Sequence, residues 1–318
     1  MNIILASYEN KWKNDLFRNF HYIIISLCKE YDYKLIDISH IDNSRKPVIF
    51  NDLLRDNEIT LTFIKNIVYI ENHNDFIITE LIPDLFKNNI RKTIISDDIH
   101  KFKELKTDYY NRFDNIIVNY RETFYQLYPD IPKTKIHWVP HGYNPEFENI
   151  KFNRDPKRRV LLAGCIGLMY PLRKRIINYR KSNPEYKNVE VYRHPGYRGV
   201  DQRFPKVLNS YLCCITDCLT LNYVVSKYFE IPASGSLLLA KIPEGDSLES
   251  LGFIDMVNFI SVTENNFLER IEFVLDNNNS ELIDNIRYNG YLLVRNNHSL
   301  LKRIDQINSL LINSESVY

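Results

Sequence analysis

The sequence predicts an α/β protein of two domains, each built on a parallel sheet with helices on its faces. Short apolar runs alternate with helix-like segments through the first half, and the same alternation starts again near residue 159. Between the two halves stands Pro-His-Gly-Tyr-Asn-Pro at 140–145, which can continue neither regular element. With 318 residues, the chain has the length for two domains of about 150 residues each.

In the first half, the apolar runs have the length of strands and the segments between them have helical spacing. The helical pattern that follows the first strand places Leu16, Phe20, Ile24 and Leu27 on one face. The predicted strands are Asn2–Ser7, Lys34–Ile38, Asn66–Ile70, Lys92–Ser96, Asn115–Asn119 and Lys135–Val139, and the predicted helices are Asn14–Tyr31, Ile77–Asn88 and Glu122–Tyr128. Strands joined by such crossovers form a doubly wound sheet, in which ligands bind at the carboxyl ends of the strands.

The second half repeats this organisation and ends in helices. The predicted strands are Arg159–Ala163, Val189–Tyr192, Tyr211–Thr216, Ser236–Ala240 and Asn258–Val262, and the predicted helices are Leu172–Ser182, Asn222–Pro232, Glu264–Asn277, Ser280–Val294 and Ser299–Ile312. We therefore predict a first domain at 1–145, a second at 146–298, and a terminal helix at 299–318 that packs back on the first domain.

Composition excludes several classes of protein. With 41 Lys and Arg against 40 Asp and Glu, the net charge is +1, which disfavours nucleic acid as the main partner. Five cysteines argue against a disulfide framework and for a reducing compartment, and Cys214 and Cys218 lack the second ligand pair of a zinc site. No apolar run reaches membrane-span length and no signal peptide is evident, so we expect a cytoplasmic protein, in host cytoplasm if a virus encodes it.

The most informative stretch is Lys227-Tyr-Phe-Glu230-Ile-Pro-Ala-Ser-Gly235, which precedes a buried strand. Asn222, Ser226 and Glu230 are predicted to share one helix face, and Gly235 suits the left-handed turn after the helix. One interpretation is a solvated Lys227–Glu230 pair without function. The other is a ligand site, because a carboxylate between Phe229 and Ile231 needs a hydrogen-bonding partner, and a ribose diol is one.

This stretch resembles the donor-site segment of GT-B glycosyltransferases, and more narrowly the spore-maturation-type (CgeB-like) enzymes and their relatives in glycosyltransferase group 1. The ending Asn297-His298-Ser299-Leu-Leu-Lys-Arg303, the preceding Asn289-Gly-Tyr291 and the junction Trp138-Val-Pro-His-Gly-Tyr-Asn-Pro-Glu-Phe147 are similar to segments of that family. The resemblance covers about residues 115–310. It implies two Rossmann-like domains that face a cleft, with a C-terminal helix that crosses back to the first domain.

The resemblance also implies a nucleotide-diphosphate sugar as the donor substrate, bound by the second domain. Glu230 would then accept hydrogen bonds from the ribose, and Lys227 would meet the diphosphate. The family's other Glu, eight residues earlier, is Asn222 here, whose amide can still bind sugar hydroxyls.

A second candidate segment follows the first strand of the second domain and runs from Gly164 to Arg175. A tight turn before a helix lets backbone amides approach a phosphate, and Arg173 and Lys174 lie at that helix start. Arg173 resembles the family's Arg after the glycine turn. The alternative is an ordinary strand, turn and helix, and the spacing supports neither a dinucleotide fingerprint nor a P-loop.

Two loops add further donor-site candidates. Tyr192-Arg-His194-Pro-Gly196-Tyr197 offers an aromatic ring and a turn where a nucleobase could stack, although the same residues also suit a plain loop. His141 in the junction is equally consistent with a contact to the donor and with a hydrogen bond to backbone.

In the first domain, Asp97, Asp98 and His100 follow a predicted buried strand. A general base for an acceptor hydroxyl must come from the side opposite the donor, so these three residues are the catalytic candidates, with Asp98 first. The alternative is that Asp97 or Asp98 caps a helix. Lys and Arg would neutralise the leaving diphosphate, so we expect no metal and no cofactor.

We therefore predict a glycosyltransferase that moves a sugar from a nucleotide sugar to a hydroxyl of a glycan, a protein or a small molecule. The alternative is a non-catalytic protein of the same fold that binds a nucleotide sugar or glycan, to which Asn222 and the small number of glycines are compatible. The sequence leaves open whether the anomeric configuration is retained or inverted.

Overall fold

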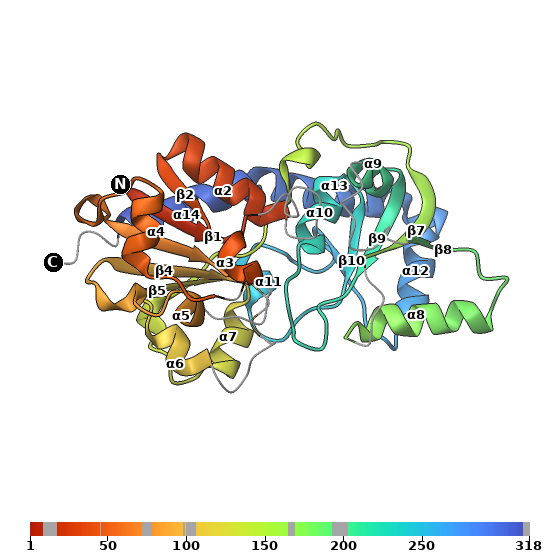
Figure 1. Ribbon diagram of the computed structural model, residues 1–318. Helices are drawn as coiled ribbons and strands as arrows, with labels where there is room; N and C mark the ends of the chain where they lie inside the picture. Colours follow the sequence, from red (N-terminus) through yellow and green to blue (C-terminus); the bar gives the residue numbers. More distant parts are fainter. Residues whose placement is uncertain are drawn as a thin grey trace. The chain divides into compact units, whose positions relative to one another are not determined.

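The computed structural model describes residues 1–8, 18–44, 46–71, 78–97, 99, 106–164, 169–192 and 203–313 (Figure 1). The chain divides into two compact units: unit 1 comprises Met1–Pro140 and Ile304–Tyr318, and unit 2 comprises His141–Arg303. No helix among the described residues is long and apolar enough to cross a membrane.

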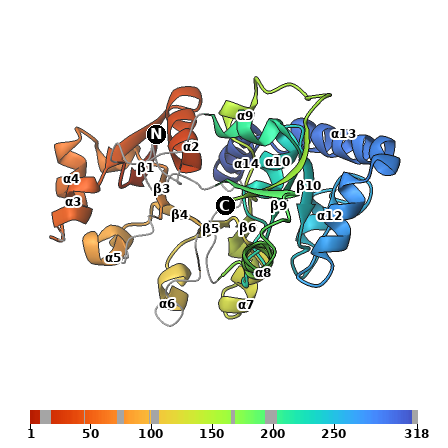
Figure 2. The same cartoon turned by 90° about the vertical axis from the view of Figure 1, so that its right-hand side faces the viewer.

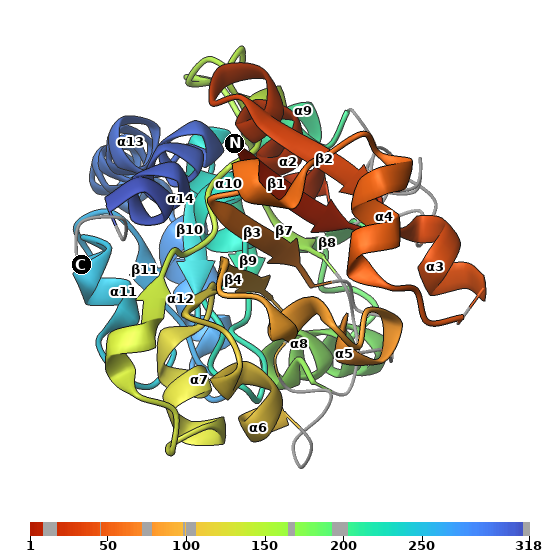
Figure 3. The ribbon, with the colours of Figure 1, turned by 60° about the vertical axis from the view of Figure 1, so that its left-hand side comes forward.

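Unit 1 contains a parallel sheet in the order β2-β1-β3-β4-β5-β6 within its described residues, and Figure 3 shows β2, β1, β3 and β4 side by side. Its strands are β1 (Asn2–Ala6), β2 (Tyr33–Asp37), β3 (Asn66–Ile70), β4 (Arg91–Ser96), β5 (Asn115–Val118) and β6 (Ile136–Trp138). Its helices are α2 (Arg18–Glu30), α3 (Ser39–Ser44), α4 (Phe50–Asp56), α5 (Ile78–Leu81), α6 (Lys106–Asn111) and α7 (Arg121–Leu127), with 3₁₀ turns at Leu61–Phe63, Leu85–Lys87 and Lys133–Lys135.

The strands of this sheet are buried on both faces, as a parallel sheet requires. Every residue of β3 is buried. Helix α14 (Leu300–Asn313) begins in unit 2 and continues into unit 1, where Asp305 accepts a hydrogen bond from Tyr31 (2.5 Å) and Asn308 accepts one from Tyr33 (3.2 Å). The C-terminal helix is therefore fixed beside α2 and β2.

Unit 2 contains a second parallel sheet, in the order β11-β10-β9-β7-β8 within its described residues. Its strands are β7 (Lys157–Ala163), β8 (Val189–Tyr192), β9 (Tyr211–Thr216), β10 (Leu237–Ala240) and β11 (Ile260–Ser261). Its helices are α8 (Pro171–Ser182), α9 (Phe204–Asn209), α10 (Lys227–Ala233), α11 (Ser247–Ser250), α12 (Phe267–Leu275) and α13 (Ser280–Asn297), with 3₁₀ turns at Pro145–Phe147 and Asn277–Asn279. Figures 1 and 2 show α10 and α13 on one face and α8 and α12 on the other.

The core of unit 2 joins its sheet to the helices that cover it. Leu162 and Ile215 from the strands, Leu172 and Ile176 from α8, and Ile271 from α12 are each at most 2% exposed. Apolar residues at helical spacing on α8 and α12 produce this packing. The four cysteines among the described residues, Cys28, Cys213, Cys214 and Cys218, are free thiols.

Two predicted helices differ from the structure. The helix expected at Asn222–Pro232 begins only at Lys227, because Leu219 and Asn222 have positive φ values of 61° and 57° and the chain turns there. The helix expected at Ile77–Asn88 is divided by Pro83 into α5 and a 3₁₀ turn.

Candidate functional site

The carboxyl ends of the unit 2 strands bring several predicted residues to one edge of the sheet. Gly164 follows β7, the first turn of α8 begins at Pro171, and α10 begins at Lys227. Two further polar residues lie at the same edge, Asp217 after β9 and Lys241 after β10. This is the edge at which doubly wound sheets bind ligands.

Gly164 and Arg173 form one packed unit. Gly164 has φ +105°, and a Cβ added there would lie 2.8 Å from Nη1 of Arg173. The guanidinium stacks over the Tyr170 ring at 4.2 Å and donates from Nη2 to Thr216 Oγ1 at 2.7 Å. Arg173 is 2% exposed, so it joins the ends of β7 and β9 from the interior, whereas its neighbour Lys174 is exposed.

Lys227 and Glu230 form an ion pair in the first turn of α10. Their side chains are only 19% and 8% exposed, and the Lys227 ammonium lies 4.8 Å from the centre of the Phe204 ring. The solvated pair considered from the sequence is therefore wrong in its exposure. In the unliganded chain Lys227 supplies the partner that the buried Glu230 carboxylate needs.

Asn222 and Ser226 do not share a helix face with Glu230, because both precede α10. The Asn222 side chain accepts a hydrogen bond from the backbone N–H of Glu244 (3.4 Å), while Ser226 offers its backbone carbonyl to the N–H of Glu230 (2.9 Å). Both residues still lie in the segment that joins β9 to α10.

Gly235 lies apart from this group, at the amino end of β10. It has φ +84°, its carbonyl accepts a hydrogen bond from Arg287 Nε (2.7 Å), and a Cβ would lie 3.3 Å from Phe152 Cα. A side chain at this position would therefore crowd Phe152 and strain the turn.

His141 belongs to a buried polar cluster with His298 and Arg303. The His141 carbonyl accepts a hydrogen bond from Arg303 Nε (3.2 Å), and Arg303 Nη2 lies 2.5 Å from His298 Nδ1. Burial, followed by the charge of Arg303, lowers the pKa of His298 to about 4, and burial lowers the pKa of Arg303 to about 10. The His298 ring packs on Phe229, the neighbour of Glu230 in α10.

Among the catalytic candidates only Asp97 lies within the described residues. It directly follows β4, is partly buried, and its backbone carbonyl accepts a hydrogen bond from the N–H of Ile99 (2.7 Å). The other predicted residues that lie outside the described residues are Asp98, His100, His194, Gly196 and Tyr197.

Asp217 is a residue that the sequence reasoning missed. It is 0% exposed, and its Oδ2 accepts a hydrogen bond from the backbone N–H of Leu172 (2.8 Å) in the first turn of α8. Burial raises the pKa of the Asp217 carboxyl, while the N–H of Leu172 and the charge of Arg173 oppose that rise. Its position directly after a predicted strand is the signal that could have identified it.

Glu71 is a second missed carboxylate, at the carboxyl edge of the unit 1 sheet. Tyr110 in α6 donates to Glu71 Oε2 (3.1 Å) and lies 2.9 Å from Ser96 Oγ, which also donates to Glu71. Burial and the nearby Glu71 charge raise the pKa of Tyr110. This buried network ties α6 to the ends of β3 and β4.

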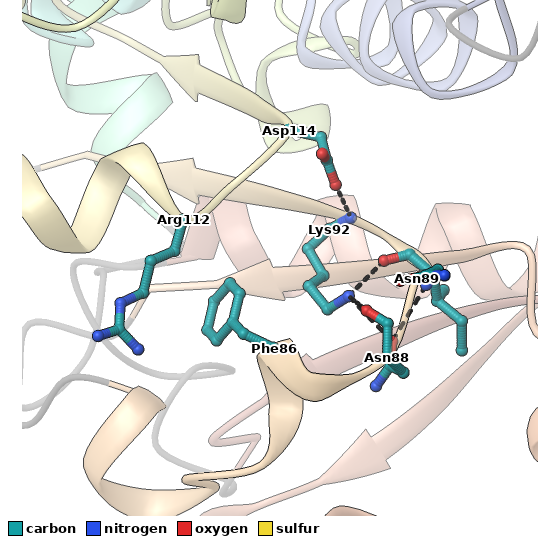
Figure 4. Close-up of a pocket in the computed structure, with 7 residues that line it drawn as sticks. Phe86, Asn88, Asn89, Lys92, Arg112 and Asp114 are labelled. Atoms are coloured by element: carbon teal, nitrogen blue, oxygen red, sulfur yellow. Dashed lines mark hydrogen bonds between the residues drawn. The ribbon is translucent and has the colours of Figure 1, made fainter. Parts of the chain in front are cut away.

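A cavity of about 630 Å³ lies at the opposite, amino end of β4 in unit 1 (Figure 4). Figure 4 shows the Phe86 ring between Arg112 and Lys92. Lys92 donates to Asn88 O (2.8 Å), to Asn88 Oδ1 (2.9 Å) and to Ile90 O, which uses all three ammonium protons. Lys92 therefore stabilises its own turn, and the cavity contains none of the predicted site residues.

Comparisons with solved structures place these two units in a known fold. The chain is similar to a glycosyltransferase from Rickettsia africae at 9% identity, with a TM-score of 0.63 over 100% of this chain and 99% of that one. It is similar to HepE from Anabaena, solved with UDP-glucose, at 11% identity, with a TM-score of 0.64 over 98% and 100%. It is also similar to sucrose-phosphate synthase from Thermosynechococcus elongatus at 11% identity, with a TM-score of 0.65 over 99% of both chains.

These structures are GT-B glycosyltransferases, and the predicted fold class of two Rossmann-like α/β domains is confirmed. No protein-family model matches the sequence, and no curated protein matches it. The narrower resemblance to spore-maturation-type enzymes stays a prediction. At such low identity the likeness establishes the fold, and the activity has to be argued from the site.

Proposed function

We propose that the protein is a glycosyltransferase that moves a sugar from a nucleotide-diphosphate sugar to a hydroxyl acceptor. The observation that carries the proposal is the buried Lys227–Glu230 pair at the start of α10, on the carboxyl edge of the unit 2 sheet. A carboxylate and an ammonium side by side suit the two halves of a nucleotide, because a ribose diol donates to the first and a diphosphate accepts from the second. The fold, shared with HepE solved with UDP-glucose, supports the same assignment.

The proposed roles follow from this placement. Glu230 binds the ribose, and Lys227 turns toward the diphosphate, which requires that the ion pair seen in the unliganded chain loosens on binding. Lys174 is the exposed cation of the α8 first turn, whereas Arg173 supports that turn from below. Unit 2 is the proposed donor domain, and the neighbouring candidates Asn222, Ser226, Gly164, His141, His194, Gly196 and Tyr197 complete the proposed donor set.

Unit 1 is the proposed acceptor domain, and a general base is expected among Asp97, Asp98 and His100. If the configuration is inverted, removal of a proton from the acceptor hydroxyl requires such a base. If it is retained, no dedicated base is needed. Replacement of each of the three by Ala or Asn, with transfer and donor binding measured separately, identifies the base by lost turnover at unchanged affinity.

The test of donor binding is a thermal-shift and turnover screen with a panel of nucleotide sugars. A ligand that binds the folded state raises its stability by an amount set by concentration over dissociation constant. We expect Glu230→Ala and Lys227→Ala to lose the shift, whereas Glu249→Ala, an exposed carboxylate on α11 of the same unit, keeps it. A shift that survives both substitutions would show that the donor binds elsewhere.

Metal independence is part of the proposal, because Lys227 and Lys174 supply the positive charge that a bound cation would otherwise supply to a leaving diphosphate. Turnover should therefore persist in EDTA at the rate measured with added Mg²⁺ or Mn²⁺. A rate that falls at least tenfold in EDTA and returns with either ion contradicts this part of the proposal alone.

The second candidate is a non-catalytic protein that binds a nucleotide sugar. The observation that favours it is that Glu230 is already satisfied by Lys227, and that an amide replaces the second family carboxylate at Asn222. Saturable binding that is lost in Glu230→Ala, with no transfer and no donor hydrolysis for any acceptor tested, supports this candidate over the enzyme.

A further inference from the structure

The first turn of α8 already holds an anion that belongs to the chain itself. Helix N-termini attract negative charge because their first N–H groups have no partner within the helix. In α8 Pro171 has no N–H, Leu172 donates to Asp217 Oδ2 (2.8 Å), and Lys174 donates to the Tyr170 carbonyl (2.9 Å). The place where a donor diphosphate was expected is therefore occupied by Asp217 in the unliganded chain.

Asp217 is weakly held for a buried carboxylate. It is 0% exposed, and its second oxygen, Oδ1, is buried and makes no hydrogen bond within the part of the chain that the structure describes. A carboxylate that is taken out of water normally accepts several hydrogen bonds on both oxygens. The negative charge on this one depends on a single backbone N–H and on nearby cations.

The groups that face Asp217 come from three elements. Arg173 on α8 and Lys241 after β10 favour its charged form, and Lys241 is itself paired with Glu264 at 2.9 Å. Tyr228 on α10 and Cys218 lie close enough to interact with Asp217, and both stay neutral near pH 7 because burial raises their pKa values. The two cations are thus the groups that a second anion would compete for.

We propose that Asp217 takes up a proton when the diphosphate of a donor binds beside the first turn of α8. This inference rests on the proposed function. A diphosphate near Arg173 and Lys241 draws on the same positive charge and repels the carboxylate, and Oδ1 has no hydrogen bond to the described residues that would keep the charge in place. Protonated Asp217 keeps Oδ2 as the acceptor for Leu172, so the helix cap survives binding.

The direction of the pH dependence follows from linkage. If the complex holds one proton more than the free protein, donor affinity increases as the pH falls. The dissociation constant should decrease by up to about tenfold per pH unit between the pKa of Asp217 in the complex and its pKa in the free protein. Below the latter value the affinity should become constant.

The experiment is isothermal titration calorimetry with four diesters of diphosphate that do not titrate between pH 5.5 and 8: UDP-glucose, GDP-glucose, ADP-glucose and dTDP-glucose. The sugar nucleotide that binds most tightly is titrated in buffers of different ionisation enthalpy, so that the heat reports protons taken up. We expect uptake that approaches about one proton per ligand across the window in which affinity rises.

Asp217→Asn is the test variant, because an amide oxygen can still accept from Leu172 while the side chain no longer titrates. It should bind with no proton uptake and with a pH-independent dissociation constant. Asp155→Asn, at an exposed Asp of the same unit, is the matched control and should behave as the wild type.

The wild-type measurement alone decides the proposal if the variant fails to fold. Binding without proton uptake overturns the role of Asp217 and leaves the proposed function standing. The same proton uptake in Asp217→Asn also overturns it, because another group then takes the proton. If none of the four compounds binds at millimolar concentration, the donor-binding function fails and this inference fails with it.

Discussion

The His298 ring should make the stability of unit 2 depend on pH. Its Nε2 faces the Leu251 carbonyl at 2.9 Å and its Nδ1 faces Arg303 Nη2 at 2.5 Å. A carbonyl only accepts and a guanidinium only donates, so this geometry requires the neutral ring with its proton on Nε2. A second proton on Nδ1 would replace the hydrogen bond from Arg303 by a repulsion between two cations.

The magnitude follows from the shift of the pKa. In the unfolded chain the pKa of His298 is about 6.5, and burial beside Arg303 lowers it to about 4 in the folded chain. A difference of this size corresponds to about 3 kcal/mol of unfolding free energy for a residue that is 5% exposed. Because the folded pKa is depressed, this stability is fully present above pH 6.5 and is lost progressively as the pH falls to about 4.

The assay is urea unfolding followed by far-ultraviolet circular dichroism at pH 7.5, 6.5, 5.5 and 4.5, for the wild type and for His298→Gln. Tryptophan emission cannot replace it, since Trp12 and Trp138 both belong to unit 1. Glutamine offers a donor and an acceptor but does not titrate, so the wild type should lose its advantage over the variant as the pH falls. Parallel loss of stability in the two proteins, or a His298 ring that titrates near pH 6.5 in NMR spectra of the folded protein, would refute the reasoning.

Three further predictions concern stability. Gly142→Ala should lower the unfolding free energy by about 2 kcal/mol or more, measured by urea unfolding, because its Cβ would lie 2.8 Å from the backbone oxygen of His298 and neither segment can move freely. Lys92→Met should cost about 2–3 kcal/mol in the same assay, since the oxygens that its ammonium satisfies become unpaired, whereas the exposed Lys87→Met should be neutral. Hydrogen bonds, first from Lys157 and then from Tyr211, lower the pKa of Glu190 to about 2, so its contribution should be present above pH 4.5 and lost between pH 4.5 and 2, and should be absent in Glu190→Gln; equal acid sensitivity in that variant would contradict it.

The sheets were predictable because their strands are buried on both faces. Such strands read as continuous apolar runs, and Asn66–Ile70 and Val189–Tyr192 match the structure residue for residue. The start of α10 was not predictable in the same way. Apolar spacing continues back to Asn222, but the backbone at Leu219 and Asn222 is left-handed, and no local propensity of Leu indicates this.

The candidate site was predictable in its position along the chain and less so in its contacts. Gly164, Lys227 and Glu230 follow from strand ends and from the helix start, which the apolar pattern reveals. That Glu230 is paired with Lys227, and that Arg173 is buried against Thr216, depends on how α10, α8 and β9 pack. Asp217 escaped prediction because an Asp after a strand resembles any polar turn residue until its burial is known.

The charges proposed to meet a donor are already neutralised inside unit 2, and this determines what binding must do. Lys227 is paired with Glu230, and the α8 N-terminus is occupied by Asp217. A diphosphate therefore does not add its attraction to isolated cations, but exchanges one ionic contact for another, so that affinity is a difference between two similar terms. Removal of either internal anion leaves a cation or a helix end unpaired, which the ligand can satisfy without competition. Loss of affinity in Glu230→Ala would then measure the ribose contact reduced by the released Lys227, and so would understate what Glu230 contributes.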